Sequence, residues 1–189
     1  VGFDDDNVTI QESSCTIAVL FFGINPANGQ LIMPKAPTTA IRGKHAARFS
    51  KVLADLGVES YCVDGKEEFR RIQLTKLIWT SVYWLLCFTQ NCTIGEVNRE
   101  MEERLIDELL AAGEDRLKTS TSFTQRSRII ADVLEYASHM ADVTPSETTA
   151  SKEFEGRNGW FLRARTNNKI HQLLLLESGY ISSNFRFCR

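Results

Sequence analysis

The chain has 189 residues, of which 43% are hydrophobic and 24% are charged. This composition excludes intrinsic disorder and a collagen-like chain, and the near balance of 22 basic against 24 acidic residues excludes a strongly basic nucleic-acid binder. A chain of this size buries about two-thirds of the surface that it exposes when unfolded, which is enough for one good core or two modest ones.

The first third of the sequence predicts strands, one helix and a further strand. Thr16–Ile24 is rich in β-branched and aromatic residues, and an Asn-Pro-Ala-Asn-Gly turn separates it from an apolar run at Gln30–Met33, so we expect a hairpin. Helical spacing of apolar residues predicts a helix over Lys44–Leu56, and Val58–Val63 predicts the last strand. A helix followed by a strand is typical of the closing part of an α/β domain.

From Asp64 onward the sequence predicts helices almost to its end. Starts that resemble capping boxes lie at Asp64, Thr93 and Ser122. Two further helices are expected over Ser151–Asn167 and Lys169–Ser178, before a short basic and aromatic tail.

Two residues predict where helices stop. We expect Gly113 to end the helix that begins near Ile94, and Pro145 to lie just beyond the helix that begins near Phe123. The longest uncharged stretch, Leu77–Gly95, is interrupted by hydroxyl and amide residues, whereas a membrane span needs about 20 mostly apolar residues. This stretch therefore predicts a buried helix and its exit turn, with no membrane as partner.

The cysteines and the beginning of the chain bear on compartment and completeness. The five cysteines are odd in number and scattered, and three lie in apolar stretches, so we expect reduced, buried thiols rather than a disulfide framework. The chain begins with Val1 and an acidic run that leads into strand-like sequence, so we expect a fragment that lacks its N-terminus. Cytoplasm and plastid both stay open as compartments. The cysteines are Cys15, Cys62, Cys87, Cys92 and Cys188.

Common catalytic and binding motifs are absent. No two glycines are spaced as Gly-x-Gly, so the dinucleotide-binding fingerprint is missing, and neither Gly-Lys pair is followed by the Ser or Thr of a phosphate-binding loop. The chain has no Cys-x-x-Cys, His-Glu-x-x-His or Gly-x-Ser-x-Gly. With only three histidines, we expect no metal site.

Lys76 is the only charged residue between Ile72 and Gly95. On a helix its neighbours one and two turns away are apolar, aromatic or hydroxyl residues. A lysine so placed either extends its ammonium out of the core or sits in a pocket, where burial lowers its pKa and makes it a usable proton donor. The pattern leaves both interpretations open.

A second dense patch covers Lys152–Phe161. It holds two glycines close together, and each glycine in a helix costs about 1 kcal/mol relative to alanine, so we expect close packing or the approach of a ligand there. Glu153 and Glu155 are either first-turn acids that the helix dipole favours or catalytic carboxylates.

These two stretches resemble a known family. Phe69–Val97, with Lys-Leu-Ile-Trp from Lys76 and Cys-Thr-Ile-Gly-Glu-Val from Cys92, resembles the catalytic-lysine helix and following turn of the ketopantoate reductases (2-dehydropantoate 2-reductases) and their plant and algal relatives. The later Lys-Glu-Phe and Arg-Asn-Gly-Trp-Phe, from Lys152 and Arg157, look like that family's second signature. The resemblance covers roughly residues 16–178.

The resemblance implies a Rossmann domain followed by a helical domain similar to the C-terminal domain of 6-phosphogluconate dehydrogenase. Residues 1–63 would be the tail of the Rossmann domain, residues 64–180 the helical domain and residues 181–189 a tail. The missing glycine-rich loop would then lie upstream of this chain, and we expect the chain alone to be inactive.

The implied reaction is the reduction of a 2-keto acid such as 2-dehydropantoate by NADPH, as in pantothenate biosynthesis. Lys76 matches the family's general acid, and Glu153 matches the carboxylate that works with it. The implied partners are a small 2-keto acid and NADP, with no nucleic acid, and a homodimer stays open.

The substrate-binding residues depart from the bacterial pattern. Where the bacterial enzymes carry asparagines four and eight residues after the lysine, this chain has Thr80 and Trp84, and the position of a family pocket serine falls at His139. Thr80, His139 and Asn158 are the substrate-binding residues that the resemblance implies, although His139 also fits a plain helix face. The departures leave a second hypothesis open, a non-catalytic helical module for dimerisation or binding.

Overall fold

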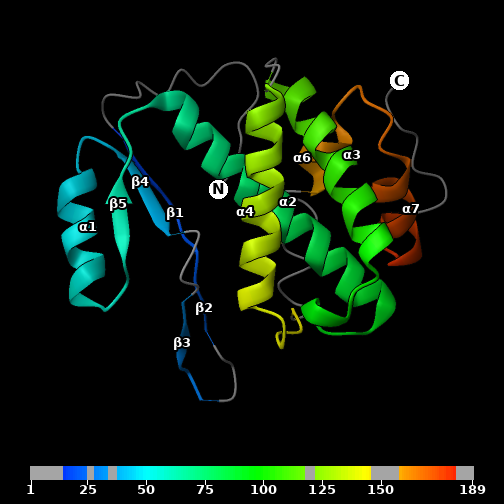
Figure 1. Cartoon of the computed structure of the whole chain (residues 1–189), viewed down its shortest axis with the longest axis horizontal. Coiled ribbons are helices and arrows are strands. Elements are labelled where there is room, and N and C mark those ends of the chain that lie inside the picture. Colours follow the sequence, from blue (N-terminus) through cyan, green and yellow to red (C-terminus); the bar gives the residue numbers. More distant parts are fainter. Residues whose placement is uncertain (1–14, 25–27, 34–37, 118–121, 146–157, 182–189) are drawn as a thin grey trace. The chain divides into compact units, whose positions relative to one another are not determined.

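A computed structural model of the chain describes residues 15–24, 28–33, 38–117, 122–145 and 158–181. These residues form two compact units, one extending to Lys76 and the other beginning at Leu77, which we call the sheet unit and the helical unit. Helix α2 (Lys66–Gln90) begins in the first and ends in the second (Figure 1). The domain boundary that we predict after residue 63 lies at the turn into α2 and stays a prediction.

The sheet unit is built on a three-stranded sheet with the order β1-β4-β5. Its strands are β1 (Thr16–Val19), β4 (Thr39–Gly43) and β5 (Ser60–Cys62). β1 runs antiparallel to β4, whereas β4 and β5 are parallel and are connected through helix α1 (Ala46–Asp55). The β4–α1–β5 segment is therefore a β-α-β unit, the repeating element of Rossmann domains.

The predicted hairpin is present but shorter than expected. Strands β2 (Gly23–Ile24) and β3 (Leu31–Ile32) pair antiparallel. The single strand predicted over Thr16–Ile24 was wrong, because the chain leaves the sheet after β1 and re-enters a ladder only at β2. Within this break the backbone N–H of Phe21 donates to a side chain, Thr39 Oγ1, at 3.1 Å and not to a backbone carbonyl of a neighbouring strand.

Helix α1 covers the sheet with an apolar face. Its buried residues Ala46 and Leu53 pack with Ile41 of β4 and with Val58, which follows the helix. The helix predicted over Lys44–Leu56 is thus confirmed to within one turn, and β5 confirms the strand predicted after it.

Within the described part of the chain, the helical unit contains the second part of α2 and five further helical segments. The longest of these, α3, contacts both α6 and α7. The segments are the 3-10 turn η1 (Ile94–Glu96) and the helices α3 (Arg99–Leu117), α4 (Phe123–His139), α6 (Gly159–Leu162) and α7 (Lys169–Glu177).

Apolar residues at helical spacing form the core of this unit. The rings of Trp79 on α2 and Tyr136 on α4 lie 4.3 Å apart between centroids, which joins these two helices through a buried aromatic pair. Other fully or nearly fully buried side chains come from α2, α3, α4 and α7: Ile78, Val82, Leu86, Leu105, Ile106, Leu109, Leu110, Ile129, Val133 and Leu175.

The capping signals were confirmed more often than the stop signals. Ser122 and Gln125 form the predicted capping box at the start of α4. Thr93 and Glu96 form another, but it caps only η1, and α3 begins later, at Arg99. The end predicted at Gly113 was wrong, because this glycine is buried within α3, where a close-packed interior position suits its small size.

The last predicted helices are confirmed in part. α7 matches the helix predicted over Lys169–Ser178. Of the helix predicted over Ser151–Asn167, residues 151–157 lie outside the described residues, and the remainder forms only the short α6. An α/β segment followed by helices is the fold class that the sequence predicts.

The four described cysteines are free thiols. Cys87 is buried and Cys92 is half-buried, but Cys15 and Cys62 are exposed, which corrects the expectation of buried thiols for these two. Across the described residues, no helix combines enough length with enough apolarity to cross a bilayer.

Candidate functional site

Lys76 lies on α2 and is half-buried. Its Nζ atom lies 5.3 Å from the centroid of the Phe21 ring, in the same unit. The backbone N–H of Phe21 donates to Thr39 Oγ1 of β4, and the Phe21 side chain is buried. A cation over an aromatic face is attracted by the negative face of the ring, so this contact is a cation–π interaction.

The Phe21 contact was not predicted, since the sequence offered only an extended lysine or a pocket. Phe21 precedes Lys76 by 55 residues and reads locally as a strand residue. Only the break between β1 and β2, which the sequence did not predict, brings this ring to α2.

Thr80, the first predicted substrate-binding residue, follows Lys76 by four positions on α2. Its side chain is buried, with 1% of the residue exposed. Residues at i and i+4 lie on the same helix face, so Lys76 and Thr80 share a face of α2. The substrate-binding role of Thr80 stays a prediction.

His139 and Asn158 lie in unlike surroundings in the helical unit. His139 is the last residue of α4 and is exposed, where a basic side chain suits the negative end of the helix dipole. Asn158 is buried, with 2% exposed, at the start of α6. The substrate-binding roles of His139 and Asn158 stay predictions. Glu153, the predicted partner of Lys76, lies outside the described residues.

Asn158 is paired with a buried histidine. Its Oδ1 lies 2.9 Å from Nε2 of His171, which is fully buried on α7. With Oδ1 as acceptor, Nε2 carries the proton and Nδ1 is a bare lone pair, which finds no hydrogen-bond partner among the described residues. Burial lowers the pKa of His171 to about 3, so the ring is neutral at physiological pH.

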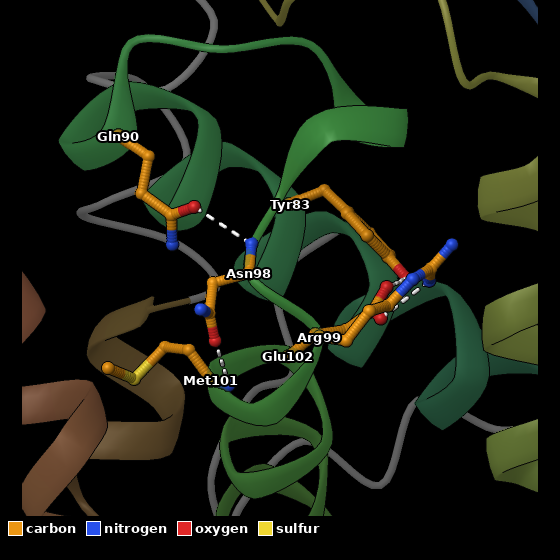
Figure 2. A network of polar contacts seen from close by, with 6 residues as sticks. All are labelled: Tyr83, Gln90, Asn98, Arg99, Met101 and Glu102. Atoms are coloured by element: carbon orange, nitrogen blue, oxygen red, sulfur yellow. Dashed lines mark hydrogen bonds and ion pairs between the residues drawn. The ribbon is translucent and has the colours of Figure 1, made fainter.

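A polar network in the helical unit was missed by the sequence analysis (Figure 2). Tyr83 on α2 donates to Oε1 of Glu102 on α3, and Arg99 reaches Oε2 of the same carboxylate at 2.6 Å. The Glu102 side chain is 1% exposed, whereas that of Arg99 is 66% exposed. Burial and the bond to Glu102 raise the pKa of Tyr83, so this hydroxyl is a poor acid at neutral pH.

Further hydrogen bonds hold the turn between α2 and α3. The backbone N–H of Asn98 donates to Gln90 Oε1 at 2.9 Å, and Asn98 Oδ1 accepts from the N–H of Met101 at 2.9 Å (Figure 2). Asn98 thereby caps α3. The six residues join the end of α2 to the start of α3, and we assign them a structural role.

The strand-to-helix turn after β4 does not fit a dinucleotide pyrophosphate. In Rossmann domains a glycine-rich strand-to-helix turn leaves room for the phosphates at the helix N-terminus. In this chain the strand-to-helix turn after β4 is closed by β1, since a Cβ on Gly43 would lie 2.1 Å from the backbone oxygen of Cys15, and Thr16 Oγ1 accepts from the N–H of His45. Within the described part of the chain, no three His, Cys, Asp or Glu side chains are grouped as a metal site.

Solved structures of ketopantoate reductases resemble this chain in fold. One is a PanE/ApbA family ketopantoate reductase from Ralstonia eutropha JMP134, with a TM-score of 0.57 and 16% identity. Another is a 2-dehydropantoate 2-reductase from Geobacter metallireducens GS-15, with a TM-score of 0.60 and 15% identity. The chain has a ketopantoate reductase-like fold. No family model and no curated protein sequence matches it.

Each of these alignments covers 87% of this chain and 59% of the reductase. The chain thus spans less than two-thirds of the length of these ketopantoate reductases. At this identity the likeness establishes the fold, an α/β segment followed by a helical domain, and leaves the substrate and the activity to be tested.

Proposed function

We propose that this chain forms the substrate-binding part of an NADPH-dependent reductase that converts a 2-keto acid, such as 2-dehydropantoate, to the 2-hydroxy acid. The observation that carries the proposal is the occurrence of a half-buried lysine, Lys76, on α2 of a chain whose fold resembles ketopantoate reductases. Similarity of fold alone is compatible with many reactions, and the position of the lysine reduces the number of candidate reactions.

In this proposal Lys76 carries the proton transfer. Negative charge builds on the carbonyl oxygen as the keto acid is reduced, and an ammonium that reaches this oxygen both stabilises the charge and supplies the proton from Nζ. The Phe21 ring lies 5.3 Å from Nζ and interacts with the ammonium. Glu153 is the carboxylate that we propose as its partner.

The hydride source in the proposed reaction is NADPH, and we assign no residue of this chain to it. In this proposal the substrate-binding residues and Lys76 bind, orient and protonate the keto acid.

Thr80, His139 and Asn158 are the residues that we propose for the keto acid. Asn158 Oδ1 is held by His171, which leaves the Asn158 Nδ2 group as the donor for a carboxylate oxygen. The two hydrogen-bonding amides of the bacterial pattern are replaced here by a hydroxyl and by Trp84, so we expect a 2-keto acid with a different side chain to compete with 2-dehydropantoate as the best substrate.

A second candidate is a non-catalytic helical module for binding or dimerisation, which Trp84 favours. This residue is half-buried on α2 and stands where the bacterial enzymes carry an asparagine. An indole has one N–H donor and no acceptor, so it does not reproduce an amide.

The two candidates are separated by the oxidation of NADPH in the presence of a panel of 2-keto acids, using the full-length polypeptide that contains this chain. Turnover of at least one acid, with the formation of a 2-hydroxy acid, supports the reductase. No turnover of any acid, with the protein folded and dimeric by sedimentation, supports the binding module.

A further inference from the structure

Cys87 and Cys92 are joined by the backbone geometry that ends α2. The N–H of Cys92 donates to the carbonyl oxygen of Cys87 at 3.2 Å, and Asn91 between them has a positive φ of 49°. A bond from the second residue beyond a helix to the fourth residue from its end, across a left-handed residue, defines a Schellman motif. This motif characteristically brings together the side chains of the two residues that it joins.

The two thiols are in contact. They form a side-chain hydrogen bond with each other, and both are free. A disulfide requires Cα atoms about 4.4–6.8 Å apart, a separation that a backbone hydrogen bond between the same two residues favours. Cys87 is buried, whereas Cys92 is half-buried and therefore open to a reagent from solvent.

We propose that Cys87 and Cys92 form a reversible dithiol–disulfide site, which a low-molecular-weight disulfide such as oxidised glutathione closes. The proposal concerns the end of α2 and is independent of the proposed reductase activity. The spacing Cys-x-x-x-x-Cys matches no metal-binding or redox motif. The two thiols are brought together by the geometry of the helix end.

The closure proceeds by two thiol–disulfide exchanges. The thiolate of Cys92 attacks one sulfur of the glutathione disulfide, which forms a mixed disulfide and releases one glutathione thiolate. The thiolate of Cys87 then attacks the Cys92 sulfur and releases the second glutathione. Two protein S–H bonds are lost and one S–S bond forms, while the small disulfide is reduced to two thiols.

The surroundings make the exchange slow. Burial raises the pKa of the Cys87 thiol to about 12, and burial with the nearby Glu96 carboxylate also raises the pKa of Cys92. The attacking species is the thiolate, so little of it is present at neutral pH. The juxtaposition of the sulfurs favours closure at equilibrium, and we expect hours rather than seconds to reach it.

Closure would fix the exit of α2. Directly after Cys92, the N–H of Ile94 donates to Val143 and the N–H of Gly95 to Ala141, so η1 is attached to the segment that follows α4. A disulfide would add a covalent link between this anchored turn and the last turn of α2.

The test uses the full chain incubated with oxidised glutathione, then alkylated and digested with trypsin without reduction. No Lys or Arg lies between Leu77 and Asn98, so a single peptide, Leu77–Arg99, carries both cysteines. We expect this peptide to become two hydrogen atoms lighter and to lose both alkylation sites, and reduction with dithiothreitol should restore them. The replacement of Cys15, Cys62 and Cys188 by serine removes competing thiols.

Variants of Asn91 separate native geometry from mere proximity in sequence. Asn91→Gly keeps the left-handed residue and should close as the wild type does. Asn91→Val disfavours the left-handed conformation by about 1–2 kcal/mol. The reduced variant relieves this strain by fraying at the end of α2, and disulfide closure must restore the ordered helix end. We expect the closure constant of Asn91→Val to fall roughly fivefold to thirtyfold, with circular dichroism confirming that both variants are folded.

Three results would overturn the proposal. One is a folded chain in which peptide Leu77–Arg99 keeps both alkylation sites after oxidation to equilibrium. Another is a glutathione adduct that persists on Cys92 beside a free Cys87. The third is equal closure of the native chain and of the same chain unfolded in urea, which would show that the helix end contributes nothing.

Discussion

The hydroxyl of Tyr83 on α2 donates a hydrogen bond to the buried carboxylate of Glu102 on α3. Tyr83→Phe removes this donor and leaves one carboxylate oxygen without it in a dry environment. We predict a loss of about 1–3 kcal/mol in the free energy of unfolding, measured by urea denaturation. Glu102→Gln, which removes the charge but keeps an acceptor for Tyr83, should cost less than Tyr83→Phe, and the reverse order would contradict this description of the network.

His171 should make the protein acid-sensitive. Its folded-state pKa is lowered to about 3 from the ordinary 6.5, so below pH 6.5 the unfolded chain binds a proton that the folded chain does not. The contribution to stability is complete above pH 6.5 and is lost as the pH falls toward 3, at about 1.4 kcal/mol per pH unit. Unfolding measured in urea between pH 7 and pH 4 should show this slope.

His171→Gln keeps a donor for Asn158 but does not titrate, so its stability should depend less on pH over the same range. His139→Gln, at an exposed position, is the matched control and should retain the wild-type slope. Equal slopes for wild type and His171→Gln would refute the assignment of a buried neutral His171.

Glu108 on α3 caps α7 from a distance in sequence. Its two carboxylate oxygens accept from the backbone N–H groups of Ile170 and His171, each at 3.0 Å. We predict that Glu108→Ala lowers the free energy of unfolding by about 1–2 kcal/mol, since two donors of the first helical turn lose a charged acceptor. Glu103→Ala, at an exposed position of the same helix, should stay within about 0.5 kcal/mol of the wild type.

Two glycines with positive φ should differ in how much stability is lost when each is replaced by alanine. Gly43 has a φ of 125°, and a Cβ there would lie 2.1 Å from the Cys15 backbone oxygen, whereas Gly57 has a φ of 76° with nothing within 4 Å. Gly57→Ala should therefore cost about 1–2 kcal/mol from the backbone conformation alone. Gly43→Ala should cost clearly more, because β1 must move away from β4, and thermal unfolding followed by circular dichroism compares the two.

Local patterns predicted the elements well and the tertiary contacts poorly. The start of α4 at Ser122 follows from residues within one turn of each other, Ser122 and Gln125, so the local sequence contains what determines it. Asn168 shows the limit of such local signals. It stands at the N-cap position of α7, but its side chain hydrogen-bonds to Phe161 and Gln172 and does not cap the helix. The acceptor that replaces it, Glu108, is about 60 residues away and has no local signal.

The candidate site shows the same limit. The isolation of Lys76 in an uncharged stretch was visible in the sequence, because one charge on an apolar helix face is conspicuous. Its aromatic neighbour Phe21 was not, because pairing between distant segments depends on strand breaks that periodicity does not reveal. The pairing of Asn158 with His171 was missed for the same reason.

The central claim is tested most directly by the rate of NADPH oxidation by the full-length polypeptide with its best 2-keto acid, in wild type and in Lys76→Ala. We predict a fall in kcat/KM of about a hundredfold or more for Lys76→Ala, which removes the proton donor to the developing alkoxide, and for Glu153→Ala, which removes the carboxylate proposed to work with Lys76. Lys51→Ala, which removes an exposed lysine of α1, should keep the wild-type rate. An active wild type in which Lys76→Ala is folded and equally fast would contradict the account.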